Sequence, residues 1–205
     1  IYYETDYFNV KEVQVSGNSI YTRDYIKTKS QIEDGEKIFS IDRRRVKDII
    51  EDEVYVKNAR VVYELPNRML IELTERQEKY QVFYNNEYIV TDKDGFVLRT
   101  GSEKNELITI ESLEDVLYNV GDTIQITGIE NVNSIFDTVD YINDEFGTET
   151  VKGLYIDSDN SFLLETEYGT YIRIRLDEDI KYQIVFAMKI INERLNNNLV
   201  VVNGL

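Results

Sequence analysis

Apolar side chains recur at every second position in three segments of the first third of the chain. Such alternation predicts strands with one buried face, expected within residues 10–19, 56–64 and 68–75. Between the first strand and the other two, apolar residues follow helical spacing behind Thr22 and Asp42, residue types that favour the position before a helix. The pattern therefore predicts the order β-α-α-β-β.

After residue 76 the pattern changes to short alternating segments separated by turns rich in Asn and Asp. It predicts three strands within 79–100 and three more within 151–176. Two longer segments, 129–146 and 178–195, instead place apolar residues on one helical stripe, which predicts two amphipathic helices. The stripes comprise Val132, Ile135, Phe136, Val139, Ile142 and Phe146, and Ile184, Ala187, Met188, Ile191 and Leu195. The expected fold class is α+β, with a multi-stranded sheet and two helices in this second part.

The last residues of the chain carry an uninterrupted apolar run from Leu199 to Val202, which predicts a strand. No charge and no proline follow as far as Leu205. Edge strands are usually protected by charge, proline or a bulge, so an exposed edge here would be open to pairing with another chain. A central strand buried on both faces carries the same kind of run. From the residues alone, both interpretations stay open.

The formal net charge of −16 is unevenly distributed. Residues 1–76 carry 13 Lys/Arg and 15 Asp/Glu, whereas residues 77–150 carry 4 and 16 and so supply −12 of the total. Within this acidic part, residues 101–128 are rich in turn formers. The shift predicts a boundary between two domains, 1–76 and 77–205. The acidic balance argues against nucleic-acid binding, which needs cations to neutralise phosphates.

Several kinds of chemistry are excluded by composition. The sequence has no cysteine and no histidine, so it can form no disulfide, no thiolate nucleophile, no His-based triad and no His-ligated metal site. The Asp-Lys-Asp-Gly turn at 92–95 lacks the ligand spacing of an EF-hand loop. Asp157 and Asp159 fit a hairpin tip better than a catalytic pair. We expect a protein that is not an enzyme, with no catalytic residue, metal or cofactor.

One basic cluster, Arg-Arg-Arg-Val-Lys at 43–47, stands out in the acidic sequence. It would suit an anionic lipid surface or an acidic partner. Acidic residues flank it at Asp42 and Asp48, so the solvated face of a short helix is the favoured interpretation.

The sequence contains no run of about 18 apolar residues, the length needed for a transmembrane helix. It starts at Ile1 rather than Met. We therefore expect a fragment whose membrane anchor lies upstream.

Three segments of the first domain resemble the POTRA domain of the FtsQ/DivIB family of bacterial cell-division proteins: YFNVKEVQVSGNSIYTRDYI, IEDGEKIFSIDRRRVKDII and VYVKNARVVYELPNRMLIELTER. The strand-turn-strand segment that ends at Glu75 and Arg76 carries the resemblance most strongly. YIVTDKDGFVL, together with a penultimate helix before a terminal strand, resembles the β domain of the same family. One departure is NELITIE, which lacks the proline of the family's Leu-Pro motif.

The resemblance implies a non-catalytic divisome protein that spans the cell membrane once and is concentrated at the division septum. This chain would be its extracytoplasmic region. Its partners would be FtsL and FtsB, called DivIC in Gram-positive bacteria, and through them it would help regulate septal peptidoglycan synthesis.

The resemblance also implies a place for partner binding, because in the family the terminal strand and the helix before it form the edge that meets FtsB/DivIC. Carried over, the strand residues are Leu199, Val200, Val201, Val202, Asn203 and Gly204. Weaker candidates for meeting acidic side chains of the partner are Arg173, Arg175 and Lys181.

Two other functions fit part of the sequence. A POTRA module of a secretion or outer-membrane assembly pore would continue into further copies or a long barrel, whereas residues 77–205 hold two amphipathic helices and no second copy. A secreted enzyme acting on the cell wall would need a carboxylate pair in a cleft. The division scaffold is therefore the favoured hypothesis.

Overall fold

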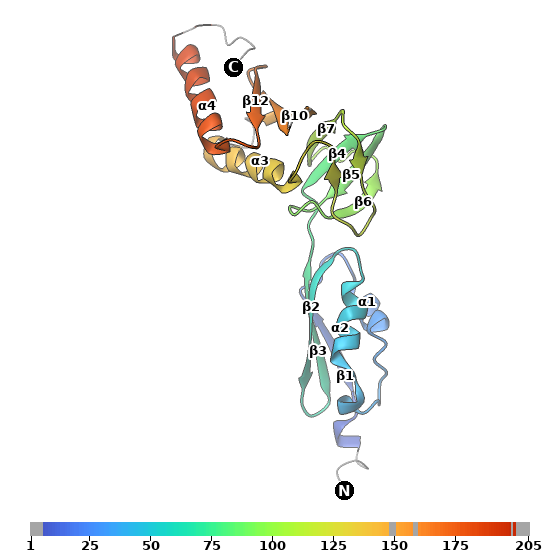
Figure 1. The fold of residues 1–205 in the computed structure, drawn as a ribbon. Helices are drawn as coiled ribbons and strands as arrows, with labels where there is room; N and C mark the ends of the chain where they lie inside the picture. Colours follow the sequence, from blue (N-terminus) through green and yellow to red (C-terminus); the bar gives the residue numbers. More distant parts are fainter. Residues whose placement is uncertain (1–5, 148–150, 158–159, 198, 200–205) are drawn as a thin grey trace. The chain divides into compact units, whose positions relative to one another are not determined.

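The computed structural model describes residues 6–147, 151–157, 160–197 and 199, and Figure 1 shows the fold. The chain divides into two compact units, residues 1–77 and 78–205. Each unit has its own hydrophobic core. Each core is built where the alternating or helical pattern of apolar residues brings one face of a strand or helix against another element.

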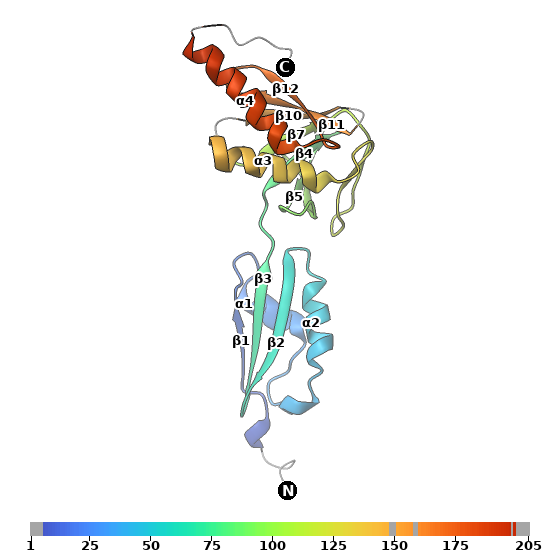
Figure 2. The same ribbon diagram turned by 60° about the vertical axis from the view of Figure 1, so that its left-hand side comes forward.

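The first unit has a three-stranded sheet in the order β1-β3-β2, with β1 parallel and β2 antiparallel to β3. This arrangement confirms the predicted β-α-α-β-β order. The elements are η2 (Asp6–Phe8), β1 (Glu12–Ser16), α1 (Arg23–Ser30), η3 (Ile38–Ser40), α2 (Arg43–Glu51), β2 (Val56–Glu64) and β3 (Arg68–Glu75). Both helices lie on one face of the sheet, which Figures 1 and 2 show from two directions.

Local hydrogen bonds fix where these helices begin. The side chain of Thr22 accepts a bond from the Tyr25 N–H, and Asp42 accepts bonds from the Arg44 and Arg45 N–H groups. Each cap satisfies donors that a helix start otherwise leaves without partners, and such a cap contributes about 1 kcal/mol. Both predicted caps are confirmed.

Glu75, at the end of β3, ties the strand to the loop before α1. Its carboxylate accepts the backbone N–H groups of Ser19, Ile20 and Tyr21 at 2.6, 2.8 and 3.1 Å, and the Ser19 hydroxyl at 2.7 Å. Burial opposes ionisation of this carboxyl, yet the hydrogen bonds outweigh it and lower the pKa of Glu75 below its ordinary value. Glu75 therefore holds the end of β3 against the loop between β1 and α1.

The second unit contains a seven-stranded sheet in the order β12-β11-β10-β7-β4-β5-β6. The short strand β7 pairs in parallel with both β4 and β10, and the other pairs are antiparallel. The strands are β4 (Tyr80–Tyr84), β5 (Glu87–Thr91), β6 (Val97–Gly101), β7 (Ile108–Ser112), β10 (Val151–Asp157), β11 (Ser161–Thr166) and β12 (Tyr171–Arg175). A two-stranded sheet joins β8 (Val116–Leu117) to β9 (Gln125–Ile126).

Two long helices, α3 (Val132–Phe146) and α4 (Ile180–Asn196), share one core with this sheet. The predicted amphipathic helices are confirmed, and their inner stripes are buried from Val132 to Ile142 and from Ile184 to Ile191. Leu195 was expected on the inner stripe, but it is 37% exposed. The 17 residues of α4 span about 25 Å, whereas the five residues of β12 span about 17 Å, so the last turn extends beyond the strand.

A buried tyrosine joins α3 to the sheet. The ring of Tyr80 stacks on Phe136 with centroids 4.4 Å apart, and its hydroxyl donates to an oxygen of Asp140 at 2.5 Å. Burial, and then the hydrogen bond to the carboxylate, raise the pKa of Tyr80, which keeps the hydroxyl protonated. The Lys79 Nζ lies 2.5 Å from the other carboxylate oxygen of Asp140, so the charge of Asp140 is paired. Tyr80, Lys79 and Asp140 together hold α3 against the sheet.

Candidate functional site

The Asp-Lys-Asp-Gly turn at 92–95, which was weighed above as a calcium loop, uses the carboxylate of Asp92 for hydrogen bonds within the turn. Asp92 is buried, and its Oδ1 accepts the backbone N–H groups of Asp94 and Phe96 at 2.9 and 3.0 Å. These bonds are those of an ordinary Asp-initiated turn. Across the part of the chain that the structure describes, no group of three or more acidic side chains is arranged to hold a metal ion.

The predicted terminal strand falls largely outside the described residues, because only Leu199 of its six residues is included. Leu199 is exposed, and its N–H donates to the Arg194 carbonyl at 2.9 Å, which places it directly after the end of α4. Residues 200–204 receive no structural account, so their pairing stays a prediction.

The three cationic candidates lie on two different sides of the sheet. Arg173 and Arg175 alternate along β12 with Ile172 and Ile174, which are buried in the core shared with α3 and α4. Because successive side chains of a strand point to opposite faces, both arginines face away from the helices. Lys181 belongs to α4. The structure therefore brings the two arginines together and leaves the lysine apart from them.

Each of these cations already has a partner within the chain. The Arg175 guanidinium donates to Asp177 at 2.8 and 3.1 Å, and Arg173 donates to the Ser161 hydroxyl at 3.4 Å. The Lys181 Nζ lies 5.1 Å from the ring centroid of Tyr141, a cation–π distance. An incoming acidic group would have to compete with these contacts, so none of the three is a strong anchor by itself.

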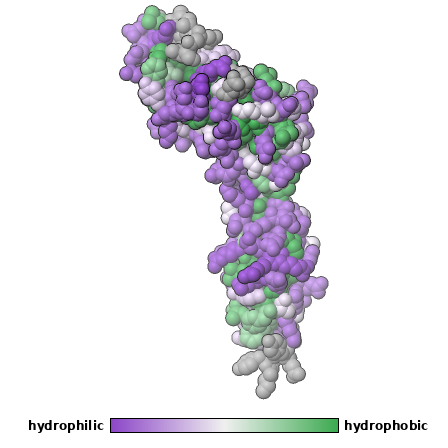
Figure 3. Space-filling view, in the orientation of Figure 1, coloured by the Kyte–Doolittle hydropathy of each residue, from purple (hydrophilic) through white to green (hydrophobic). Residues whose placement is uncertain are grey.

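Sequence reasoning missed an exposed apolar surface on the outer side of α4. Tyr182, Val185 and Phe186 are 66%, 48% and 53% exposed, and the rings of Tyr182 and Phe186 are stacked with centroids 6.0 Å apart. We call these three residues the α4 apolar face. Hydrophobic patches interrupt the hydrophilic surface over α4 in Figure 3. The sequence could have revealed this surface, because Tyr182, Val185 and Phe186 follow i, i+3 and i+4 spacing. They form a second apolar row on α4, opposite the inner stripe.

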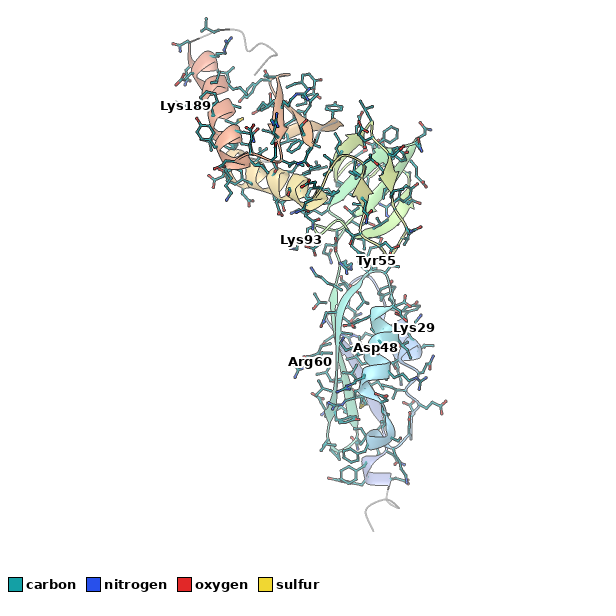
Figure 4. The ribbon with its side chains drawn as sticks, viewed as in Figure 1. Lys29, Asp48, Tyr55, Arg60, Lys93 and Lys189 are labelled. Atoms are coloured by element: carbon teal, nitrogen blue, oxygen red, sulfur yellow. The ribbon has the colours of Figure 1, made fainter. Side chains whose placement is uncertain are left out.

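A cation extends this surface by one helical turn. Lys189 follows Val185 and Phe186 at helical spacing, is exposed, and points away from the sheet in Figure 4. Exposed aromatic and aliphatic residues beside a charged rim are the composition of many protein-binding surfaces. The α4 apolar face is therefore the best candidate for an interaction site in the second unit.

No helix in the described part of the chain is both long enough and apolar enough to cross a membrane. Among the described residues, the two groups whose pKa is strongly raised are the hydroxyls of Tyr80 and Tyr155, which donate to Asp140 and Glu165.

Comparison with known proteins finds two similarities. Residues 8–76 match the family model of the FtsQ-type POTRA domain. The chain is also 26% identical to the cell division protein DivIB of Clostridium tetani (strain Massachusetts / E88), over 190 residues that cover 92% of this chain and 71% of that protein. Both similarities point to the FtsQ/DivIB family. The first unit contains an FtsQ-type POTRA domain, and the second unit is a β domain.

The FtsQ/DivIB family consists of non-enzymatic cell-division proteins. Within the family match, the segment that ends at Glu75 has a clear physical role, because its carboxylate holds three backbone N–H groups of the β1–α1 loop. The two similarities support a role for this chain as a cell-division scaffold.

Proposed function

We propose that this chain is the extracytoplasmic region of a single-pass membrane protein of the divisome. It binds FtsL and FtsB/DivIC-type division proteins at the septum and so helps regulate septal peptidoglycan synthesis. The match of residues 8–76 to the FtsQ-type POTRA domain supports this function, as does the similarity to a DivIB over 92% of the chain.

The observation that carries the proposal is the α4 apolar face. In an otherwise highly charged protein, three adjacent large side chains remain exposed on the helix that leads into the terminal segment. Burial of such side chains provides the apolar centre that a stable interface needs, at roughly 25 cal/mol per Å² of apolar surface removed from water.

The proposed binding mode joins two contributions. The strand at 199–204 supplies main-chain hydrogen bonds to a partner strand, and the α4 apolar face supplies side-chain burial and specificity. Lys189 is placed to meet an acidic group at the rim. Arg173 and Arg175 lie on the opposite side of the sheet, where they would contact only a partner that wraps around β12.

The experiment measures binding of the extracytoplasmic part of DivIC to the chain. Replacing both Tyr182 and Phe186 with serine removes apolar area without disturbing the core, since both side chains point outward. We expect a loss of affinity of about tenfold or more, typical of truncating anchor residues. The matched control is Leu117→Ser, an exposed apolar residue on β8. Equal binding by the double variant and the native chain would exclude the α4 apolar face.

A second variant tests the strand. Val201→Pro removes a backbone donor, which abolishes partner binding at an outer edge while leaving the fold intact. Thermal unfolding is measured beside binding. Collapse of the fold would identify a central strand and end the edge hypothesis, and an intact fold with undiminished binding would move the site elsewhere.

The membrane anchor is tested on the complete gene. We expect a stretch of about 20 apolar residues upstream of Ile1, the length of a transmembrane helix. A complete reading frame without such a stretch would contradict the single-pass arrangement.

A further inference from the structure

Aromatic side chains form a continuous row at one end of the POTRA domain. The ring of Phe8 lies 5.0 Å from that of Tyr7 and 5.5 Å from that of Phe39, measured between centroids. The Phe39 ring in turn lies 5.9 Å from the ring of Tyr63. The guanidinium of Arg43 ends the row, 4.4 Å from the centroid of the Tyr63 ring. The row therefore joins η2, η3, β2 and the start of α2.

Several large apolar side chains at this end are exposed. Tyr7 and Phe39 are 61% and 56% exposed, and Leu65, in the turn between β2 and β3, is 59% exposed. Figures 1 and 2 show η2 and the β2–β3 turn at the same end of the domain, and a hydrophobic patch lies at this end in Figure 3. We call Tyr7, Phe39 and Leu65 the apolar pole.

The apolar pole lies where the chain enters the domain. Only residues 1–5 precede η2 in this chain, and five residues reach at most about 18 Å. From the β2–β3 turn, the eight residues of β3 carry the chain about 27 Å to Glu75 at the other end of the sheet. A transmembrane helix directly upstream of Ile1 would therefore end close to the apolar pole.

Cations lie next to the apolar pole. Lys37 directly precedes η3 and pairs through its backbone with Asn9, just after η2. Lys11 is exposed, and its N–H donates to the Asn67 carbonyl in the β2–β3 turn at 2.9 Å. Arg44, in the first turn of α2, is exposed and makes no ion pair or hydrogen bond through its side chain within the described part of the chain. Arg44 can therefore meet an external anion.

The carboxylates at this end already have partners. Asp6 accepts a bond from the Asn9 side chain at 3.0 Å, and Asp42 accepts the N–H groups at the start of α2. Glu12 and Glu64 lie 3.9 and 3.8 Å from the guanidinium of Arg68. These contacts reduce the repulsion that an anionic surface would meet here.

We propose that the apolar pole inserts into the headgroup layer of the membrane and so orients the POTRA domain on it. This inference rests on the proposed membrane anchor. Tyr7 and Phe39 place their rings at the boundary between headgroups and acyl chains, where the Tyr7 hydroxyl stays in water. Arg44 reaches the lipid phosphates.

The distribution of charge favours contact through this end alone. The chain has a net charge of −16, and residues 77–150 supply −12 of it, so most of the surface is repelled by anionic lipid. An end that combines apolar side chains with cations can still approach. Its three apolar side chains come from three separate turns, and a fluid lipid surface adapts to such spacing.

The membrane contact is tested on the whole chain, attached by an N-terminal polyhistidine tag to vesicles of phosphatidylcholine and phosphatidylglycerol that contain a nickel-chelating lipid. The chain has no tryptophan, so Phe39→Trp introduces a single fluorescent reporter. Lipids brominated on the acyl chain should quench it about twofold, since interfacial side chains lie about 5–10 Å into the headgroup and acyl boundary. Absence of quenching would overturn the proposal.

The matched reporter is Ile20→Trp. Ile20 is 44% exposed, and its N–H donates to Glu75 at the other end of β3. We expect no quenching of this reporter. Equal quenching of both reporters would show that the domain has no preferred orientation. A reporter at Phe39 whose emission in free solution changes with protein concentration would assign the pole to a second copy of the chain. Either result would overturn the proposal.

Insertion must also be separated from proximity imposed by the tag. Adding Tyr7→Ser and Leu65→Ser to the Phe39→Trp chain removes two of the three apolar contacts, both of them exposed in the folded chain. We expect quenching to fall to the level of the Ile20→Trp reporter, with the thermal unfolding of the POTRA domain retained. Undiminished quenching would mean that the tag alone brings the reporter to the lipid, which would overturn insertion.

The cationic contribution is tested by Arg44→Glu in the Phe39→Trp chain. Quenching should fall about twofold on vesicles with phosphatidylglycerol and stay the same on phosphatidylcholine alone, since a cation near an anionic surface is attracted to it. Arg23→Glu, an exposed arginine in the first turn of α1, is the matched control. Equal losses in the two variants would assign the attraction to net charge and overturn the contact of Arg44 with phosphate.

These outcomes are distinct from failure of the proposed function. The tag supplies the attachment, so the vesicle experiment has the same meaning whether or not the complete gene encodes a transmembrane helix. A gene without such a helix would contradict the single-pass arrangement. An unquenched reporter at Phe39 would contradict only the orientation of the POTRA domain on the membrane.

Discussion

The POTRA domain and the β domain present different kinds of surface. The POTRA domain has a groove between α2 and β2 that is lined by Arg43, Arg44 and Lys47, whereas the β domain has an apolar helix face with one cation at its rim. Their internal contacts are of the same kind. Each domain has its own apolar core, and carboxylates hold backbone N–H groups in both, as Glu75 does in the POTRA domain and Asp92 in the β domain.

The difference determines how each surface responds to its surroundings. Contacts between charges add specificity and speed of association, while buried apolar area supplies lasting affinity. Because the two domains also have separate cores, a substitution in one should leave the stability of the other unchanged.

The largest expected effect is confined to the POTRA domain and comes from Gly17→Val. Gly17 has φ +78°, and a Cβ at this position would lie 2.1 Å from the Leu73 carbonyl oxygen. The chain must shift to accommodate it, so we expect a loss of about 3 kcal/mol or more. Calorimetry of the whole chain should show the POTRA transition lowered while the β-domain transition keeps its temperature.

Gly35→Ala is the matched control. Gly35 has φ +88° but no atom within 4 Å of its added Cβ, so only backbone strain remains. We expect a loss of about 1 kcal/mol, the usual penalty of a left-handed conformation for an ordinary residue. Equal effects of the two substitutions would show that the contact with Leu73 is unimportant.

The corresponding test of the β domain is Tyr80→Phe. The change keeps the ring on Phe136 but removes the hydroxyl that donates to Asp140. Loss of a hydrogen bond to a charged group costs about 1.5–3 kcal/mol. Urea unfolding should show a less stable β domain beside an unchanged POTRA domain. A drop in POTRA stability instead would contradict the assignment of Tyr80 to a separate core.

Glu75→Gln should destabilise the POTRA domain by a smaller amount, and the loss of stability should depend on pH. The folded pKa of Glu75 is lowered, so its stabilisation is present above the unfolded pKa, near 4.5, and is lost as pH falls through the folded pKa. The substitution should cost about 1–2 kcal/mol at neutral pH, since a charged acceptor becomes neutral. In acid, below the folded pKa, the stabilities of native and variant POTRA domains should converge. A constant gap at all pH values would rule out ionisation as the cause.

Much of the POTRA domain could be predicted because its signals are local. Thr22 and Asp42 cap helices within a few residues, and the strands at 56–64 and 68–75 alternate around a single turn. The bond between Glu51 and the Ala59 N–H escaped prediction, because no periodic pattern reveals which side chain will cover a sheet edge. The groove therefore became visible only in three dimensions.

The β domain was harder to predict in its middle. The strand β7 lies in the segment interpreted as turn-rich, yet it sits at the centre of the sheet between β4 and β10. Both of its pairings are parallel and join residues far apart in sequence, such as Tyr80 with Ile108 and Leu154 with Ile110. Short parallel strands without a hairpin give little local signal. On α4, the inner stripe was expected to reach Leu195, and the outer apolar row was missed because it does not contribute to the core.

The smallest expected effect is that of salt on binding through the α4 apolar face. Raising the ionic strength from about 0.1 M to about 1 M shortens the Debye length from about 10 Å to about 3 Å and screens exposed charges. Binding of DivIC through the α4 apolar face should change little, since burial of apolar area does not depend on charge. A steep fall of the affinity with salt would mean that charge governs this surface too, and the contrast between a charged groove and an apolar helix face would no longer hold.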